Sequence, residues 1–452
     1  MTDQLKEELS NEELDLWLEK LGVPGASIGV WSDGSAAEWH AGVREAGHNS
    51  PVDARTAFRI GSLSKVFAAT LICVLAGRGL VRLQDRIVQW LPQVNWGQPR
   101  LAREITIEDL LAHRSGLDDS PPATQVPFDA TTQEYISSCG ELLSLAPPRT
   151  VFSYSNTGYM LCARVIELAT GRAYADALRT VLLEPLGVVD DVVVDPVIGA
   201  TGHLVADGRV VTVPASLRVA VAESAIGGLS ATTRGLLSVG AIQCQVPRQL
   251  HELGLDSELA PNVMLRPRIA VGDRLAGTHY GLGWVLGQRR RLSIAQHGGW
   301  LYGQEAFLRV VPERRIAVAM LANSYGGFPL FHQVLSRFNR SVFGVALREP
   351  HVPRLRSYAG APALQGFAGS YVRRDFTAHV EATGQALCLT TIPRRGLISS
   401  FTDHPLQRVG RHLFVARHQD LPYPTYIQFS DLRQGKPQYL EMQMRSAVRS
   451  AD

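Results

Sequence analysis

The amino-acid sequence predicts an α+β domain followed by a small all-β domain. Strand patterns occur near the N-terminus, between residues 26 and 39, and return between residues 280 and 322. The stretch between them, from residue 62 to 190, is mainly helical in pattern. Because strands begin and end this first part, we expect one antiparallel sheet closed by both ends, with helices packed around it. A chain of 452 residues is also too long for one ordinary core.

The elements of the first domain follow from local patterns. Ser10 and Glu13 form a capping box for an amphipathic helix, and Gly22 marks its end. Residues 26–39 alternate around a Ser-Asp-Gly-Ser turn, which predicts a hairpin. The late strands are expected at 280–286, 292–296, 306–311 and 316–322.

Prolines mark a break near the C-terminal end of this domain. The pattern is interrupted at Pro350, Pro353 and Pro362. Beyond them, short stretches such as 376–381 and 440–445 alternate apolar with polar side chains, which is typical of a small β-barrel or sandwich. We therefore expect a first domain over 1–348, a linker over 349–362 and a β-domain over 363–452.

The composition excludes several classes of function. A net charge of +3 supplies no basic footprint for nucleic acid. No stretch approaches the roughly 20 apolar residues of a membrane span, and the charged N-terminus does not resemble a signal peptide. The five cysteines are scattered and lack metal-ligand spacing, which is typical of buried thiols in a reducing compartment. We expect a cytoplasmic protein with no metal, no cofactor, no nucleic-acid partner and no membrane partner.

The stretch FRIGSLSK, residues 58–65, contains a serine and a lysine three residues apart. Only four of the 45 basic residues are lysines, and Lys65 is the one that follows a serine at this spacing. The apolar run after it predicts a helix start, so Ser62 and Lys65 share one face. The helix N-terminus and partial burial lower the pKa of the amine, and a neutral lysine can take a serine proton. The alternative is that Ser62 caps the helix while Lys65 snorkels to water.

The stretch FSYSNTGYM adds a tyrosine and an asparagine ahead of an apolar helix. We expect Tyr154 to share or relay the proton of Ser62, and Asn156 to hold Lys65 and a substrate amide. The alternatives are a core tyrosine and a helix cap.

The stretch AQHGGWLYGQ places His297, Gly298 and Gly299 between two predicted strands. Paired glycines on a strand favour a close approach of another group to the backbone. The alternative for His297 is an ordinary loop histidine.

The order of these three motifs resembles the serine β-lactamase and penicillin-binding protein family, in particular its class C β-lactamase and D,D-carboxypeptidase branch. The neighbouring stretches TIEDLLAHRSGL, YGLGW and HGGWLYGQEAF agree with this family. The resemblance implies a β-lactamase/transpeptidase-like first domain, an antiparallel sheet flanked by helices, and a small C-terminal all-β domain, a lipocalin-like barrel.

The resemblance also implies a role for each motif residue. Ser62 is the acyl-forming nucleophile, and Lys65 and Tyr154 form the proton-shuttling pair. Asn156 orients this pair. The backbone amides of Ser62 and Trp300 form the oxyanion hole, in which such a donor contributes about 3 kcal/mol of transition-state stabilisation.

The third motif departs from the β-lactamases. His297 stands where those enzymes place a lysine that helps hold a substrate carboxylate, so the sequence argues against β-lactam hydrolysis. Gly298 and Gly299 are expected to contact the substrate. Arg445, on the polar side of the last strand, is a candidate for binding a substrate carboxylate or a carrier phosphate, and the alternative is a solvated strand arginine.

The chain is most similar to the penicillin-binding-protein-type thioesterases, which release and macrocyclise nonribosomal peptides. This implies a serine acyltransferase acting on a peptidyl thioester with a D-residue at its acyl end, delivered by a carrier protein of a peptide synthetase. The first alternative is a hydrolase of the same family, either a family-VIII-like esterase or a D-stereospecific aminopeptidase or amidase. The second alternative is a catalytically silent ligand sensor. The sequence leaves open whether Lys65 or Tyr154 is the primary base.

Overall fold

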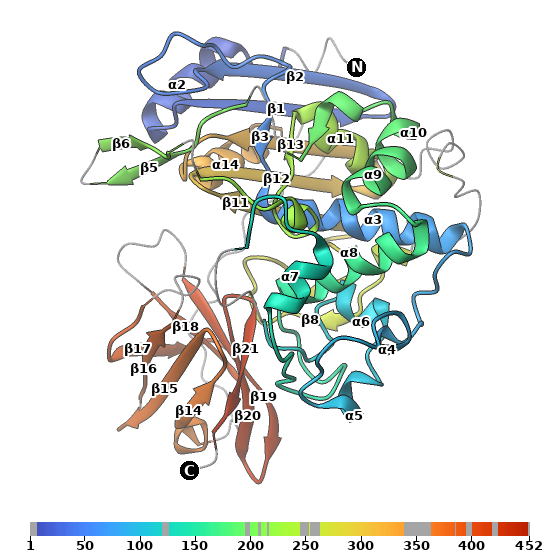
Figure 1. The fold of residues 1–452 in the computed structure, drawn as a ribbon. Helices are drawn as coiled ribbons and strands as arrows, with labels where there is room; N and C mark the ends of the chain where they lie inside the picture. The colour runs from blue at the N-terminus through green and yellow to red at the C-terminus, as the bar shows by residue number, and fades with distance from the viewer. Residues whose placement is uncertain are drawn as a thin grey trace.

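The computed structural model has a sheet-and-helix body with a β-barrel beside it (Figure 1). Helix α2 (Asn11–Leu21) opens the body as predicted. The Ser10 side chain accepts a hydrogen bond from the Glu13 backbone N–H, and Gly22 ends the helix with a left-handed φ of 64°. The structure describes residues 7–119, 126–194, 199–206, 209–214, 217–244, 253, 263–338, 363–384, 386–394, 400–417 and 424–450.

The body contains an eight-stranded antiparallel sheet that joins the two ends of the first domain, which confirms the predicted layout. The N-terminal strand pairs directly with the last strand of the domain, with Gly29 opposite Ala319. The strand order is β2-β1-β13-β12-β11-β10-β9-β8. Their bounds are β1 (Gly25–Ser32), β2 (Ser35–Gly42), β8 (Ile269–Ala270), β9 (His279–Tyr280), β10 (Val285–Arg289), β11 (Leu292–Leu301), β12 (Gln304–Val311) and β13 (Ile316–Ala322).

The single strand predicted over 280–286 is wrong in one respect. The chain turns between β9 and β10, where the Gly281 N–H donates to the Trp284 carbonyl at 2.8 Å. Gly283 takes a φ of +78°, which a strand does not allow. An added Cβ at Gly283 would lie 2.8 Å from the Ala69 side chain, so the turn also packs against helix α3 (Ser64–Gly77).

Helices cover both faces of the sheet (Figure 1). On one face α11 (Thr233–Ile242) packs on β1, β12 and β13, and the large core there includes α3 and α8 (Asn156–Thr170). On the other face α2 packs beside α14 (Gly327–Phe338) over a second core. The shorter helices are α4 (Ile87–Trp90), α5 (Pro99–Ala102), α6 (Ile107–Leu111), α7 (Thr132–Ser138), α9 (Tyr174–Leu178) and α10 (Glu184–Leu186).

Small elements complete the body. Three two-residue strands, β3 (Phe58–Arg59), β7 (Ser230–Ala231) and β4 (Val192–Val193), form a separate sheet. A hairpin of β5 (His203–Ala206) and β6 (Arg209–Thr212) projects from the upper body (Figure 1). Two short helical turns, η1 (Gly61–Leu63) and η4 (Val221–Ala225), lie beside α3.

The C-terminal strands form a closed barrel around a core of its own. The expected all-β barrel is therefore present. The predicted linker over 349–362 lies outside the described residues, and the domain boundaries stay a prediction. The barrel strands are β14 (Gly369–Val372), β15 (Phe376–Thr383), β16 (Ala386–Pro393), β17 (His404–Arg408), β18 (Leu413–Ala416), β19 (Thr425–Arg433), β20 (Lys436–Met442) and β21 (Arg445–Arg449).

The hairpin of β20 and β21 fastens the barrel to the segment that leads into α8. The Tyr154 N–H donates to the Met444 carbonyl at 2.8 Å. The Ser446 hydroxyl donates to the Phe152 carbonyl at 2.7 Å. A barrel residue, Arg373, also donates to the Ser153 hydroxyl at 3.2 Å. These contacts bring the barrel to the start of the helix that carries the second motif.

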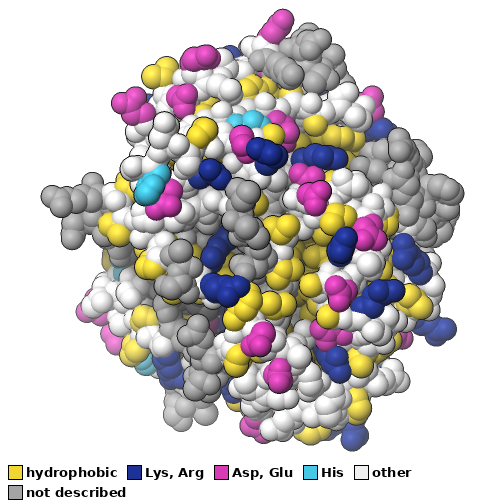
Figure 2. Space-filling model, turned by 45° about the horizontal axis from the view of Figure 1, so that its top comes forward, with side chains coloured by type: hydrophobic (Ala, Val, Ile, Leu, Met, Phe, Trp, Pro, Cys, Tyr) yellow, Lys and Arg dark blue, Asp and Glu magenta, His cyan; other side chains and the backbone are white. Residues whose placement is uncertain are grey.

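The face of the molecule shown in Figure 2 has no concentration of one charge sign. On the face in Figure 2, acidic and basic side chains are interspersed, which agrees with the small net charge. Among the helices that the structure describes, none has the length and apolar character needed to cross a bilayer.

Candidate active site

Ser62 and Lys65 lie together where η1 passes into α3. The Lys65 Nζ lies 3.3 Å from the Ser62 Oγ and donates to the Ile226 carbonyl at 2.6 Å. Lys65 is fully buried, whereas Ser62 is partly accessible. Neither alternative from the sequence describes this geometry, because Lys65 does not reach water and the N-cap of α3 is Leu63, without a side-chain cap.

The surroundings of Lys65 favour its neutral form. Burial is the main cause that lowers the Lys65 pKa from 10.5 to about 7. Arg445 acts in the same direction, whereas the carboxylates of Asp119 and Glu223 act against it. A neutral amine at hydrogen-bond distance from a hydroxyl is equipped to take its proton.

Tyr154 lies directly beside Lys65. The Lys65 Nζ is 4.9 Å from the centre of the Tyr154 ring. Burial raises the Tyr154 pKa, while the neighbouring Ser62 hydroxyl and Arg445 oppose the rise. Among the described residues the Tyr154 hydroxyl has no well-aligned hydrogen-bond partner. It therefore stays protonated at neutral pH and faces the serine and the lysine as a proton donor.

An aromatic cage holds Tyr154 in place, and sequence reasoning missed its central residue, His113. The His113 ring lies 4.2 Å from that of Tyr154, centre to centre, and it also contacts Phe152, Tyr159 and Tyr280. Its Nδ1 accepts the Ser155 N–H at 3.1 Å, which places the proton of the neutral ring on Nε2. Burial lowers the His113 pKa, so the ring stays uncharged.

His297 is a buried strand residue and not a loop histidine. Its Nδ1 donates to the Gly298 carbonyl at 2.7 Å, so Nε2 accepts from the Tyr280 hydroxyl at 3.2 Å. Burial, followed by the charge of Lys65, lowers the His297 pKa to about 3. The third motif therefore contributes a neutral hydrogen-bonding group where β-lactamases have a cation.

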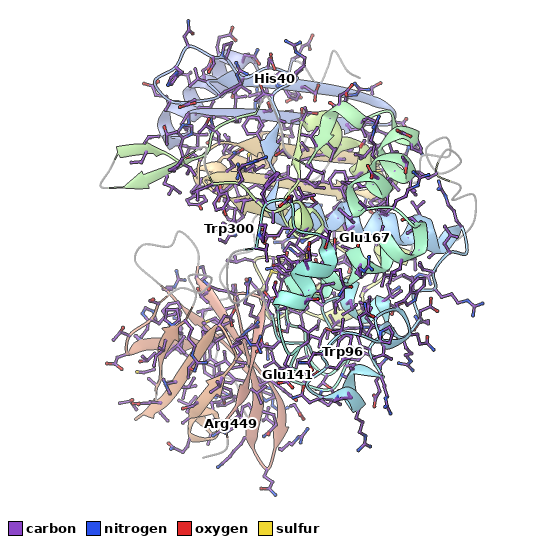
Figure 3. The ribbon with its side chains drawn as sticks, viewed as in Figure 1. His40, Trp96, Glu141, Glu167, Trp300 and Arg449 are labelled. Atoms are coloured by element: carbon purple, nitrogen blue, oxygen red, sulfur yellow. The ribbon has the colours of Figure 1, made fainter. Side chains whose placement is uncertain are left out.

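Gly299 allows β11 to touch the helix start, whereas an added Cβ at Gly298 would meet the Phe307 ring at 3.0 Å. An added Cβ at Gly299 would lie 2.0 Å from the Ile60 carbonyl oxygen and 2.7 Å from the Ser62 nitrogen. One at Gly61, whose φ is +48°, would meet the backbone of Trp300 at 2.6 Å. The η1 backbone that carries Ser62 and the β11 backbone at Trp300 therefore lie against each other, while the oxyanion hole itself stays a prediction. The Trp300 side chain is 55% exposed and lies on the side of the body that faces the barrel (Figure 3).

Asn156 is placed differently from expectation. Its Nδ2 donates to the Asp119 carboxylate at 3.3 Å. Among the described residues no hydrogen bond joins Asn156 to Lys65, so the expected direct contact is absent. Asp119, which sequence reasoning missed although it follows TIEDLLAHRSGL closely, is the hydrogen-bond partner of Asn156 and also acts on the charge of Lys65.

Arg445 belongs to the site and is not a solvated strand arginine. Its guanidinium lies 5.6 Å from the centre of the Tyr154 ring, and its side chain is 14% exposed. Asp375 holds it at 3.7 Å and also contacts Arg373 at 2.5 Å, and Arg373 in turn reaches Asp118 of the body at 3.2 Å. These are ion pairs by distance more than aligned hydrogen bonds. The barrel therefore contributes a cation to the site.

The arrangement as a whole provides a nucleophile, a neutral base, a protonated phenol and two converging backbone segments. Within the described parts of the chain, no group of three His, Cys, Asp or Glu side chains is placed to hold a metal ion. The chemistry available to these residues is acyl transfer through a serine ester.

Comparison with known proteins places this site in a family. The β-lactamase family model matches residues 10–334. Penicillin-binding protein 4 of Amycolatopsis lactamdurans is 28% identical over 76% of this chain and 92% of its own length.

Solved structures also align with the chain. The crystal structure of SurE superposes with a TM-score of 0.78 at 25% identity, over 97% of this chain and 98% of SurE. The D-amino acid amidase of Ochrobactrum anthropi superposes with a TM-score of 0.58 at 25% identity, over 71% of this chain and 91% of the amidase. The family match spans the three motifs and all strands of the large sheet, and the chain belongs to the β-lactamase family.

Proposed function

We propose that this protein is a serine acyltransferase that forms an acyl-enzyme on Ser62, releases a nonribosomal peptidyl thioester and macrocyclises it. The observation that carries the proposal is the buried Lys65 amine, 3.3 Å from the Ser62 hydroxyl, with a pKa of about 7. A lysine this close to neutrality exists as a free amine in a large fraction of molecules at working pH, which suits a general base.

The first step forms an ester. Lys65 takes the proton of Ser62 as the oxygen attacks the thioester carbonyl, and the backbone amides of Ser62 and Trp300 stabilise the oxyanion. The carbon–sulfur bond breaks, and the thiol leaves with a proton returned by Lys65 through Tyr154. The high pKa of Tyr154 favours Lys65 as the base and Tyr154 as the proton relay.

The second step resolves the ester. In the proposed reaction the N-terminal amine of the same peptide attacks the acyl carbon, an amide bond forms, and Ser62 regains its proton from the attacking nitrogen through Lys65. Arg445, Gly298 and Gly299 are proposed to hold the peptide, with Arg445 supplying the cation that the third motif lacks. Delivery by a carrier protein and a cytoplasmic location belong to the same proposal.

Similar proteins support a D-residue at the acyl end. SurE was also solved with D-Leu, and the aligned amidase acts on D-amino acid amides by its name. The amidase equally favours the second candidate, a hydrolase that passes the acyl group to water. A silent sensor would have no need of a desolvated lysine beside a serine, whose burial is costly.

The deciding experiment is product analysis with a synthetic peptidyl thioester that carries a free N-terminus. We expect a cyclic peptide when the acyl-terminal residue is D and much less product when the same residue is L. Linear acid as the sole product would assign a hydrolase. Ser62→Ala should abolish all turnover. If the wild type forms no acyl adduct, the catalytically silent ligand sensor is the remaining reading.

A further inference from the structure

Asp119 is a buried carboxylate at the edge of the site that the motifs do not include. It is 4% exposed. Its Oδ1 accepts from the Thr157 N–H at 3.0 Å, the Thr157 hydroxyl at 3.1 Å and the Ser155 hydroxyl at 3.3 Å. Its Oδ2 accepts from the Asn156 amide at 3.3 Å. The first three contacts cap α8, and a helix cap alone would account for them.

The fourth contact does more than cap the helix. An ionised carboxylate only accepts hydrogen bonds, so it selects the orientation in which the NH₂ group of Asn156 faces Asp119. The Asn156 carbonyl oxygen is thereby directed elsewhere, and no described residue donates a hydrogen bond to it. This oxygen is then available to a donor on the substrate or on Lys65.

We propose that Asp119 is a positioning residue that fixes the amide of Asn156 for catalysis and places a negative charge beside the Ser62–Lys65 pair. Its role is exerted through Asn156 and through the field at Lys65, without contact to the reacting atoms. The inference rests on Ser62 acylation, which is part of the proposed function.

The charge of Asp119 has a definite effect on the base. Among the charges near Lys65, Asp119 acts most strongly to keep the ammonium protonated. Without it the Lys65 pKa falls further, and the amine is neutral at lower pH. The titratable and charged groups that surround Lys65 and influence its protonation are Asp119, Glu223, Arg445, His113, His297, Tyr154 and Tyr159.

The test is a double-mutant cycle of Asp119→Asn and Asn156→Ala, read as the rate of Ser62 acylation by an activated p-nitrophenyl ester. We expect Asp119→Asn to slow acylation about tenfold or more, because a hydrogen bond to a charged group is lost. In the Asn156→Ala background the same change should cost little. The acid limb of the pH–rate profile should move to lower pH.

Thr157→Val is the matched control, because it removes a helix-capping donor to Asp119 and leaves the charge and the Asn156 contact. It should lower thermal stability without moving the acid limb. If circular dichroism shows that Asp119→Asn does not fold, Asp119→Glu takes its place, because it keeps the charge and displaces it by one methylene. Asp119→Glu should slow acylation and leave the acid limb of the pH–rate profile at its wild-type pH.

Two outcomes would overturn the inference. One is an equal loss from Asp119→Asn in both backgrounds with an unchanged limb, which would make Asp119 a helix cap alone. The other is a wild-type acylation rate in Asp119→Glu or Asp119→Asn. Absence of acylation in the wild type would instead refute the proposed function, so the two failures are distinguishable.

Discussion

Replacing Lys65 by methionine should inactivate the protein and make it more stable at neutral pH. Methionine has nearly the shape of lysine and no charge, so it suits a site where the lysine is fully buried in the core. The ammonium form of Lys65 is disfavoured by burial, which lowers its pKa from 10.5 to about 7. The native state of the wild type therefore carries an electrostatic cost that the variant lacks.

The size of this cost follows from the pKa. The unfolded chain binds more protons than the native state between about pH 7 and pH 10.5, so wild-type stability rises with pH across this window. At pH 7 the cost is about 4 kcal/mol, from about 1.4 kcal/mol per pKa unit. Methionine leaves the Ile226 carbonyl, which Lys65 contacts at 2.6 Å, without its donor, at a cost of about 1 to 3 kcal/mol. The net gain at pH 7 is about 1 to 3 kcal/mol.

Chemical unfolding of both proteins at about pH 7 and about pH 10 measures this difference. The advantage of Lys65→Met should shrink as pH rises and vanish or reverse at the upper value, where the native lysine is neutral and its electrostatic cost has fallen to about 1 kcal/mol. Lys20→Met, at an exposed position in the last turn of α2, is the control and should show no such trend. A Lys65→Met variant that is equally destabilised at both pH values would refute a desolvated lysine.

The other expectations concern the strand contact, the barrel and the pH profile. Gly299→Ala brings a Cβ within 2.0 Å of a carbonyl oxygen and should cost about 2 kcal/mol or more and stop acylation, whereas Gly287→Ala, in open space on β10, should be neutral by both assays. Equal behaviour of these variants would contradict close packing of β11 on η1. Arg373→Ala should lower the unfolding free energy by about 3 to 5 kcal/mol, because it leaves buried carboxylates unpaired. Arg433, which forms an exposed ion pair with Asp431, is the control, and Arg433→Ala should lower the unfolding free energy by less than about 1 kcal/mol. Similar losses from Arg373→Ala and Arg433→Ala would mean that the buried ion pairs do not hold the barrel. Ser62 acylation, followed by mass spectrometry, should rise with pH through a pKa of about 7, and a rise near about pH 4 would assign the base to a carboxylate.

Local spacing was sufficient to predict the core of the site. Ser62 and Lys65 are one helical turn apart, and any helix start at this point brings their side chains together. Gly299 indicated a close backbone approach because only glycine permits it, and the structure shows the Ile60 carbonyl there. The alternation of the C-terminal residues likewise predicted the barrel strands, since one face of each must line a core.

Long-range partners were not predictable in the same way. The carbonyl of Ile226 holds Lys65 from 161 positions along the chain, and a backbone oxygen has no sequence signature. Arg445 has an unremarkable strand pattern, and its burial arises from docking of the barrel on Tyr154. The predicted hydrogen bond between Asn156 and Lys65 is not formed, and the Asn156 amide instead donates to Asp119, a residue outside the three motifs.

Arg445 and Lys65 respond to the same negative charge, and this links the barrel to the chemistry. Both are cations in buried surroundings near Asp119, and Arg445 acts to lower the Lys65 pKa. A guanidinium has a higher intrinsic pKa than an amine. When repulsion and poor solvation disfavour two neighbouring cations, it is therefore the lysine that releases its proton. We infer that docking of the β20–β21 hairpin helps keep Lys65 neutral. A barrel with its own core would then influence activity through one side chain, by setting the charge state of the base rather than by supplying a reacting group.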